Sequence, residues 1–135
     1  GDDWTGELTY LNFSEPFDYV TIPAELDVIS AGRGVELHLQ YPGEPAQDLK
    51  YTVEVLEDGR RLGNEPVMAR VENRDGGVVI KTRTECEDLG RDAICDMTYT
   101  ITDTSFVFAK MVTLTEDDDV TREDTFLRNE FRFSR

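Results

Sequence analysis

The stretch WTGELTYLNF, residues 4–13, begins with the only tryptophan of the chain and then alternates polar and apolar residues. In a β-strand successive side chains point to opposite faces, so Leu8 and Tyr10 would share a face with Trp4. Gly6 has no Cβ, which lets a large ring lie flat on the strand or lets the strand bend sharply. The stretch therefore predicts a first strand with a bulky ring near its beginning.

The same period of two recurs along the chain in short segments separated by turn sequences such as AGRG, PGEP and NRDGG. This pattern predicts an all-β protein that forms a single domain over residues 1–135. After the first strand, further strands are expected over residues 20–28, 35–41, 49–55, 66–73, 78–86, 95–102, 105–115 and 120–133.

The connections between these segments are mostly too short for a crossover helix. Neighbouring strands should therefore pair antiparallel, as a meander of about 8–10 strands. A sheet of this length with one apolar face twists and exposes its edges, which favours curling into a barrel or splitting into a sandwich. We expect a closed barrel, with a β-sandwich as the alternative.

The last segment, TFLRNEFRFSR at residues 125–135, bears on this choice. Antiparallel pairing with the first strand would bring Arg135 close to Trp4. A guanidinium over an indole is the preferred cation–π pair, worth about 0.5–2 kcal/mol. We therefore expect Trp4, Gly6 and Arg135 to close the barrel.

The motif DWTGELTY at one end and the arginine of FRFSR at the other resemble the calycins, the superfamily of lipocalins and fatty-acid-binding proteins. In that superfamily a first-strand tryptophan is covered by a last-strand arginine. In order, WTGELTYLNF, VTIPAELDV, YPGEP and RNEFRF are similar to small exported bacterial members with a lipocalin-like barrel, over nearly the whole chain. The resemblance implies an interior cavity for a small apolar molecule.

The inner face of such a barrel can be read from the alternation. Tyr10, Tyr51 and Tyr99 lie on the apolar faces of their strands, where a buried phenol needs a hydrogen-bond partner. In a filled core they would bond to the backbone or to one another, whereas in a cavity they and Asn129 would orient a ligand. The expected lining residues are Tyr10, Leu37, Leu39, Tyr51, Val53, Tyr99, Phe106, Phe108, Asn129 and Phe131.

The chain has 14 Lys and Arg against 29 Asp and Glu, a formal charge of -15, which disfavours nucleic acid and anionic membrane surfaces as partners. Arg128 and Arg132 alternate onto the face opposite Phe131, so the interior should be poor in positive charge unless a bulge turns Arg70 or Arg83 inward. The expected partner is a small neutral hydrophobic molecule, with a cationic one also allowed.

Cys86 and Cys95 enclose eight residues, with no second cysteine pair and no histidine nearby, unlike any four-ligand zinc site. A disulfide across a hairpin is favoured over two free thiols, and it points to an oxidising compartment. The longest apolar run, residues 106–109, is far shorter than the roughly 20 residues of a membrane-spanning helix.

The chain opens with GDDW, as a mature or truncated protein would. Together with the expected disulfide, this start predicts an exported protein, periplasmic or extracellular, with envelope anchoring through a preceding segment as a further option.

No catalytic signature is present. His38, the only histidine, is flanked by Glu36 and Gln40 on the polar face of its strand, which is typical of a surface residue and not of a base or a haem ligand. Serine and cysteine nucleophiles lack a histidine to activate them. TEDDDV, residues 115–120, has adjacent carboxylates but lacks the glycine and ligand spacing of an EF-hand loop, which favours an acidic hairpin tip.

These patterns predict no enzyme activity, no cofactor and no metal site. Two functions remain open. One is a calyx that binds a small hydrophobic molecule inside the barrel, and the other is a packed β-domain that acts through its surface as an envelope structural or accessory protein.

Overall fold

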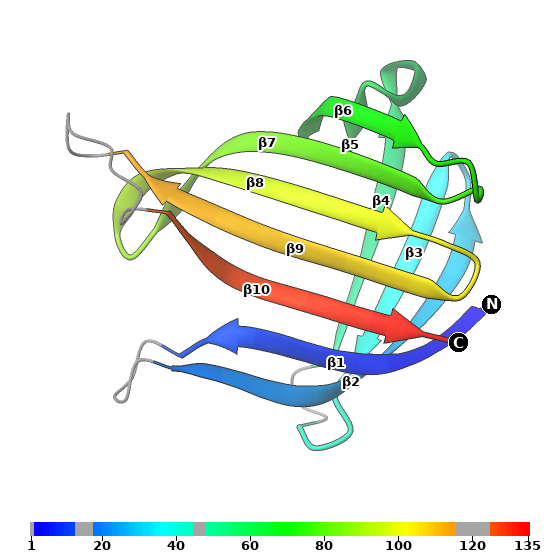
Figure 1. Ribbon diagram of the computed structural model, residues 1–135, viewed down its shortest axis with the longest axis horizontal. Helices are drawn as coiled ribbons and strands as arrows, with labels where there is room; N and C mark the ends of the chain where they lie inside the picture. The colour runs from blue at the N-terminus through cyan, green and yellow to red at the C-terminus, as the bar shows by residue number, and fades with distance from the viewer. Residues whose placement is uncertain (1, 13–17, 45–47, 116–124) are drawn as a thin grey trace.

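The computed structural model describes residues 2–12, 18–44, 48–115 and 125–135, without the side chains of residues 2, 31 and 51. Its ten strands form a closed antiparallel barrel in which each strand pairs with its neighbours in sequence and the first pairs with the last (Figure 1). The expected barrel is confirmed, and the sandwich alternative is wrong. The strands are β1 (Asp2–Leu11), β2 (Tyr19–Ala31), β3 (Gly34–Gln40), β4 (Leu49–Leu56), β5 (Arg61–Leu62), β6 (Glu65–Glu72), β7 (Val78–Asp88), β8 (Arg91–Ile101), β9 (Ser105–Leu114) and β10 (Thr125–Ser134).

The strand boundaries agree with the sequence pattern except at a few places. The pattern missed β5, which has only two residues, whereas the turn it predicts at EDG, residues 57–59, is present as a 3-10 turn. β8 begins at Arg91, four residues before the predicted start. The last predicted strand began at residue 120, but residues 116–124 lie outside the described chain and β10 is described from Thr125. The acidic segment TEDDDV likewise falls outside the description, apart from Thr115.

The barrel closes where β1 pairs with β10. Gly6 lies opposite Phe133 in this pairing, and a Cβ added to Gly6 would lie 1.7 Å from the carbonyl oxygen of Arg132. The backbone of β10 thus occupies the space that any side chain at position 6 would need. Gly6 is required because the first and last strands approach so closely.

The start of β1 and the end of β10 lie at the same end of the barrel (Figure 1). Trp4, near the start of β1, packs into the buried cluster at that end. It is 6% exposed, and the guanidinium carbon of Arg135 lies 4.5 Å from the centroid of its ring, which is the contact that the sequence predicted. The Nε of Arg135 also donates a hydrogen bond to the carbonyl oxygen of Asp103, at 2.7 Å. Arg135 therefore joins the β8–β9 turn to the first strand.

Replacing Trp4 with alanine should destabilise the protein by about 3–5 kcal/mol, because it removes a buried aromatic ring and opens one end of the barrel. Chemical denaturation followed by circular dichroism measures this change. A loss smaller than about 1 kcal/mol would contradict the role of Trp4 as a plug.

Gly6→Ala should prevent β1 from pairing with β10 and destabilise the protein by more than about 4 kcal/mol, the range of severe core disruptions. Gly43→Ala is a matched control, because nothing lies within 4 Å of the Cβ that it would add. The control should change the free energy of unfolding by less than about 0.5 kcal/mol. Equal stability of the two variants would show that the barrel tolerates a side chain at position 6.

Two clusters of buried side chains fill much of the barrel. The larger one contains Trp4 and stacked rings such as Phe108 and Phe131, whose centroids are 4.4 Å apart. The smaller one lies beside the disulfide and consists of Ala93, Cys95, Val112 and Leu114. The larger cluster is built by the inner faces of β1, β2, β3, β9 and β10 and consists of Trp4, Ala24, Leu26, Leu37, Leu39, Tyr41, Phe108, Phe131 and Phe133.

The strands of the barrel are joined by the fewest residue pairs around β5. Only two residue pairs join β5 to β4, and only two join it to β6. Among the described pairings, residues 49–54 of β4 pair only with β3, and residues 83–88 of β7 pair only with β8. Both segments are therefore edge strands on either side of a gap.

The disulfide lies on this unsupported part of β7. Cys86 and Cys95 are bonded across the β7–β8 hairpin with their Cα atoms 6.0 Å apart, as the sequence predicted. The bond joins β7 to β8 where, among the described residues, β7 pairs with no strand on its other side. The disulfide thus stabilises a segment of β7 that lacks the hydrogen bonds of a second neighbouring strand.

The double substitution of Cys86 and Cys95 by serine should lower the free energy of unfolding by about 2.7 kcal/mol, the loop-closure term for a ring of this size. Thiol titration of denatured, unreduced wild-type protein should find no free thiol. Two titratable thiols in protein secreted into an oxidising compartment would contradict the bond.

Candidate ligand-binding site

A cavity of about 330 Å³ lies inside the barrel at the end covered by Trp4. Its volume is at the lower end of the roughly 300–1,000 Å³ found for small-molecule sites. The lining contains no charged side chain, and Trp4 and Tyr99 are the only lining residues whose side chains have a polar atom. The lining residues are Trp4, Val28, Gly34, Val35, Leu37, Val53, Val55, Leu62, Ile80, Tyr99, Ile101 and Phe106.

The cavity lies between two walls. β2 to β5 supply one wall, in which Val35 faces Val53, and β7 to β9 supply the other, in which Ile80 faces Tyr99. Val55 lines the cavity and is nevertheless 45% exposed. The cavity therefore reaches solvent beside Val55, next to the short strand β5.

Three polar side chains, those of Tyr99, Thr82 and Glu65, are joined by hydrogen bonds next to the cavity wall formed by β7 to β9. The hydroxyl of Tyr99 donates a hydrogen bond to Oε1 of Glu65 at 2.9 Å, and the hydroxyl of Thr82 donates to the same oxygen at 2.7 Å. Thr82 is 1% exposed. Glu65 faces Leu62 in the β5–β6 pairing and so shares the face of a residue that lines the cavity.

Sequence reasoning missed this network. The period-two pattern predicts that this strand begins at Pro66, so Glu65, the first residue of β6, falls outside the predicted strand. Thr82 did leave a signal, because it follows Val78 and Ile80 at the same spacing and is a polar residue on an apolar face. A polar residue in that position requires a buried partner.

The structure separates the predicted lining residues into groups. Leu37, Val53, Tyr99 and Phe106 line the cavity. The side chain of Tyr51 lies outside the described part of the chain. The other five belong to the inner face but not to this cavity: Leu39, Phe108 and Phe131 are buried in the larger cluster, and Tyr10 and Asn129 face each other, half-buried, across β1 and β10.

The cavity lining contains no positive charge, but the inner face of the barrel carries one that the sequence analysis did not name, Lys110. Lys110 lies between the buried residues Phe108 and Val112 at period two, and faces Met97 and Asn129 in the neighbouring strands. Lys110 therefore lies on the inner face of β9, but it is not one of the residues that line the cavity.

Two β-bulges also change the faces of arginines. A bulge between Val67 and Ala69 places Arg70 opposite Ile80, and Arg70 forms an ion pair of 2.7 Å with Glu72. A second bulge lies between Leu127 and Asn129, at Arg128.

Arg128 departs from the simple outward position expected for it. It forms an ion pair of 3.2 Å with Asp88 and donates a hydrogen bond to the carbonyl oxygen of Leu11, also at 3.2 Å. Arg128 thus holds the end of β7 to the end of β1.

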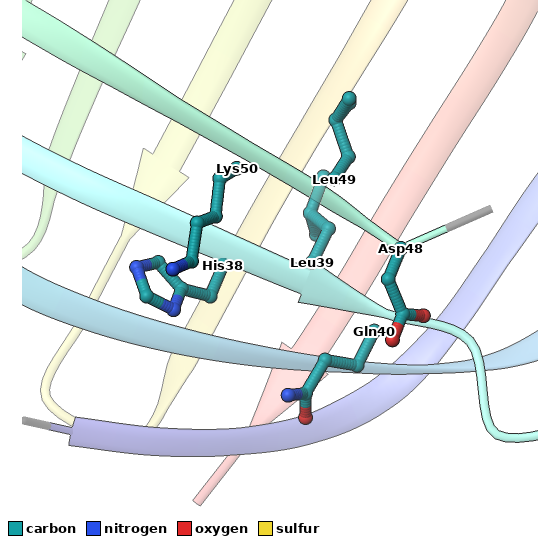
Figure 2. Close-up of a pocket in the computed structure, with 6 residues that line it drawn as sticks. All are labelled: His38, Leu39, Gln40, Asp48, Leu49 and Lys50. Carbon is teal, nitrogen blue, oxygen red and sulfur yellow. The ribbon is translucent and has the colours of Figure 1, made fainter. Parts of the chain in front are cut away.

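A second depression, of about 320 Å³, lies at the β3–β4 pair (Figure 2). His38 and Lys50 face each other there across the two strands, and Nε2 of His38 lies 2.7 Å from Oε1 of Glu36. None of the six residues that line it is a serine, threonine or cysteine.

The turn beside this depression is held by Asp48, whose Oδ1 accepts a hydrogen bond from the backbone N–H of Tyr41 at 2.9 Å. Burial raises the pKa of the Tyr41 phenol, and the negative charge of Asp48 raises it further. Both effects keep Tyr41 neutral in the larger cluster.

Within the described chain, no three His, Cys, Asp or Glu side chains are grouped so that they could hold a metal ion. None of the described helical segments has the length and apolar character to cross a membrane.

Comparison of the chain with models of known protein families and with curated protein sequences gives no match. The barrel itself, with ten antiparallel strands in sequence order and a Trp–Arg contact between its first and last strands, is consistent with a calycin-like architecture.

Proposed function

We propose that this protein is a lipocalin-like binding protein that holds a small hydrophobic molecule in the cavity at the Trp4 end of the barrel. The observation that carries the proposal is the cavity itself: about 330 Å³, inside the barrel, with no charged residue among those that line it. Barrels of eight to ten strands either fill their interior with side chains or hold one small ligand. Here the larger cluster fills part of the interior and leaves this space beside it.

Binding without catalysis accounts best for these residues. The cavity wall contains one ionisable side chain, Tyr99, and its hydroxyl is already bonded to Glu65. His38 lies on another part of the molecule, paired with Glu36. The proposed role is therefore to carry or sequester a molecule and not to transform it.

The Cys86–Cys95 disulfide supports an exported location. Disulfides form and persist in the periplasm and outside the cell, and they are rare in reducing compartments. The acidic composition, with a formal charge of -15, suits a well-solvated carrier.

Action through the surface is the second candidate, and one observation favours it. Met68 and Val71 on β6 are 63% and 55% exposed, although both are large apolar side chains. Met68 lies beside the edge strand formed by residues 83–88, and Val71 lies farther along β6, opposite Val79. An accessory or structural role would use this side of the barrel as a contact surface.

Native mass spectrometry of protein purified from its own host, followed by solvent extraction, tests the proposed function directly. A co-purifying lipid, pigment or other small apolar molecule would support the calyx. A clean apo mass, together with no uptake of hydrophobic dyes, would contradict it and favour the surface role.

Filling the cavity should abolish binding. Val53→Phe adds a ring to a small apolar space, and we expect it to weaken the binding of the neutral dye phenylnaphthylamine by at least about tenfold, measured by fluorescence titration. Thr52→Phe is the matched control, because Thr52 is exposed on the opposite face of β4. If both variants bound the dye like the wild type, the dye site would lie elsewhere.

A further inference from the structure

We propose that the Glu65 carboxylate selects the ligand of this cavity, and that the ligand is a small apolar molecule carrying a protonated amine. The inference rests on the proposed binding function and specifies its ligand class. It follows from the polar network behind the cavity wall.

The network leaves hydrogen-bond acceptors, not donors, at this end of the cavity. The Tyr99 hydroxyl proton is directed at Oε1 of Glu65, 2.9 Å away, so this proton is not available to an acceptor group of a ligand. The bond from Thr82 ends on the same oxygen. The second oxygen of Glu65, Oε2, receives neither of these bonds. Glu65 is half-buried and is not itself a lining residue, but Leu62 opposite it is, so a ligand with N–H groups at this end of the cavity would complement the carboxylate.

The charge of Glu65 acts strongly at this position. Its carboxylate lies one hydrogen bond behind Tyr99, a residue of the cavity wall, and the wall has no charged side chain to oppose its field. In a low-dielectric interior the attraction of a cation and the repulsion of an anion are both larger than in water.

The basic residues nearest Glu65 in register have other partners or lie outside the cavity wall. Arg61, next to Leu62 on β5, donates a hydrogen bond to the carbonyl oxygen of Asn64 at 2.8 Å. Arg70 faces Ile80, but it is paired with Glu72 at 2.7 Å, and the two side chains are 52% and 65% exposed. Lys110 faces Met97 and lies outside the cavity wall. The cavity is thus apolar along its length and negative at the Tyr99 end.

Three probes of equal chain length test the inference: n-octylamine, n-octanol and octanoate, titrated into the intact protein by calorimetry. The amine should bind about tenfold more tightly than the alcohol, as expected for one charge-assisted hydrogen bond, and octanoate should bind most weakly. The preference for the amine should persist at raised salt, because a buried pair is screened less than adsorption to an acidic surface.

Glu65→Gln assigns the preference to one residue. Glutamine keeps an acceptor oxygen for Tyr99 and Thr82 but removes the charge, so the affinity for octylamine should fall about tenfold, to that for octanol, with octanol binding changed less than about twofold. Glu85→Gln removes the same charge from the exposed face of β7 and should leave the ratio of the two affinities unchanged.

The outcomes separate the two proposals. Binding of octanol as tightly as octylamine, or tightest binding of octanoate, would overturn the inference and leave the binding function intact. An equal loss in Glu85→Gln would also overturn it, because the preference would then come from the net charge of the whole molecule. Failure of all three probes to bind would overturn the proposed function. The comparison on wild-type protein needs no variant, so it decides even if Glu65→Gln does not fold.

Discussion

The close approach of the first and last strands at Gly6 is the constraint on which the rest of the barrel depends. The carbonyl oxygen of Arg132 occupies the place of a side chain at position 6, so only glycine lets β1 and β10 pair along their length. This pairing leaves neither strand with a free edge along the paired residues and closes the sheet around the larger cluster. It also brings Arg135 onto Trp4, which makes the covered end of the barrel one wall of the cavity.

The opposite side of the barrel is held much more weakly, and the cavity lies against it. β5 contributes only two residue pairs on each side, while β7 and β8 share eleven. Regions with few ladder bonds open locally at the lowest free energy, so we expect ligand exchange beside Val55 and Leu62 and not through the Trp4 end. The disulfide limits this weakness to the β5 region, because it fastens the unsupported part of β7 to β8. The β1–β10 side of the barrel therefore provides stability, and the β5 side provides access for the ligand.

Much of the fold can be predicted from the sequence because a period of two assigns each residue of a regular strand to a face. This reasoning identified the barrel, its Trp4–Arg135 closure, the hairpin disulfide and four residues of the cavity wall. It fails where the period is interrupted, since a shift of one residue exchanges the two faces. The bulge before Ala69 turns Arg70 toward Ile80, and β5 is too short to show any period. Glu65 is the first residue of β6, between the short strand β5 and the bulge before Ala69. No period in the sequence therefore indicates its hydrogen bonds with Tyr99 and Thr82, which form only when the strands pack together.

The surface charge and the Glu65 carboxylate act on a ligand over different distances. The surface charge makes a broad negative field, but at physiological salt that field is screened beyond about 8 Å and does not distinguish one small cation from another. The Glu65 carboxylate acts over a single hydrogen bond behind an apolar wall, where screening is weak and the shape of the cavity limits what can approach. The acidic exterior can therefore raise the local concentration of cations, whereas the half-buried Glu65 carboxylate is the charge that we propose selects an apolar one. An apolar amine satisfies both conditions, since its charge is attracted by the surface and its hydrocarbon part fits the lining.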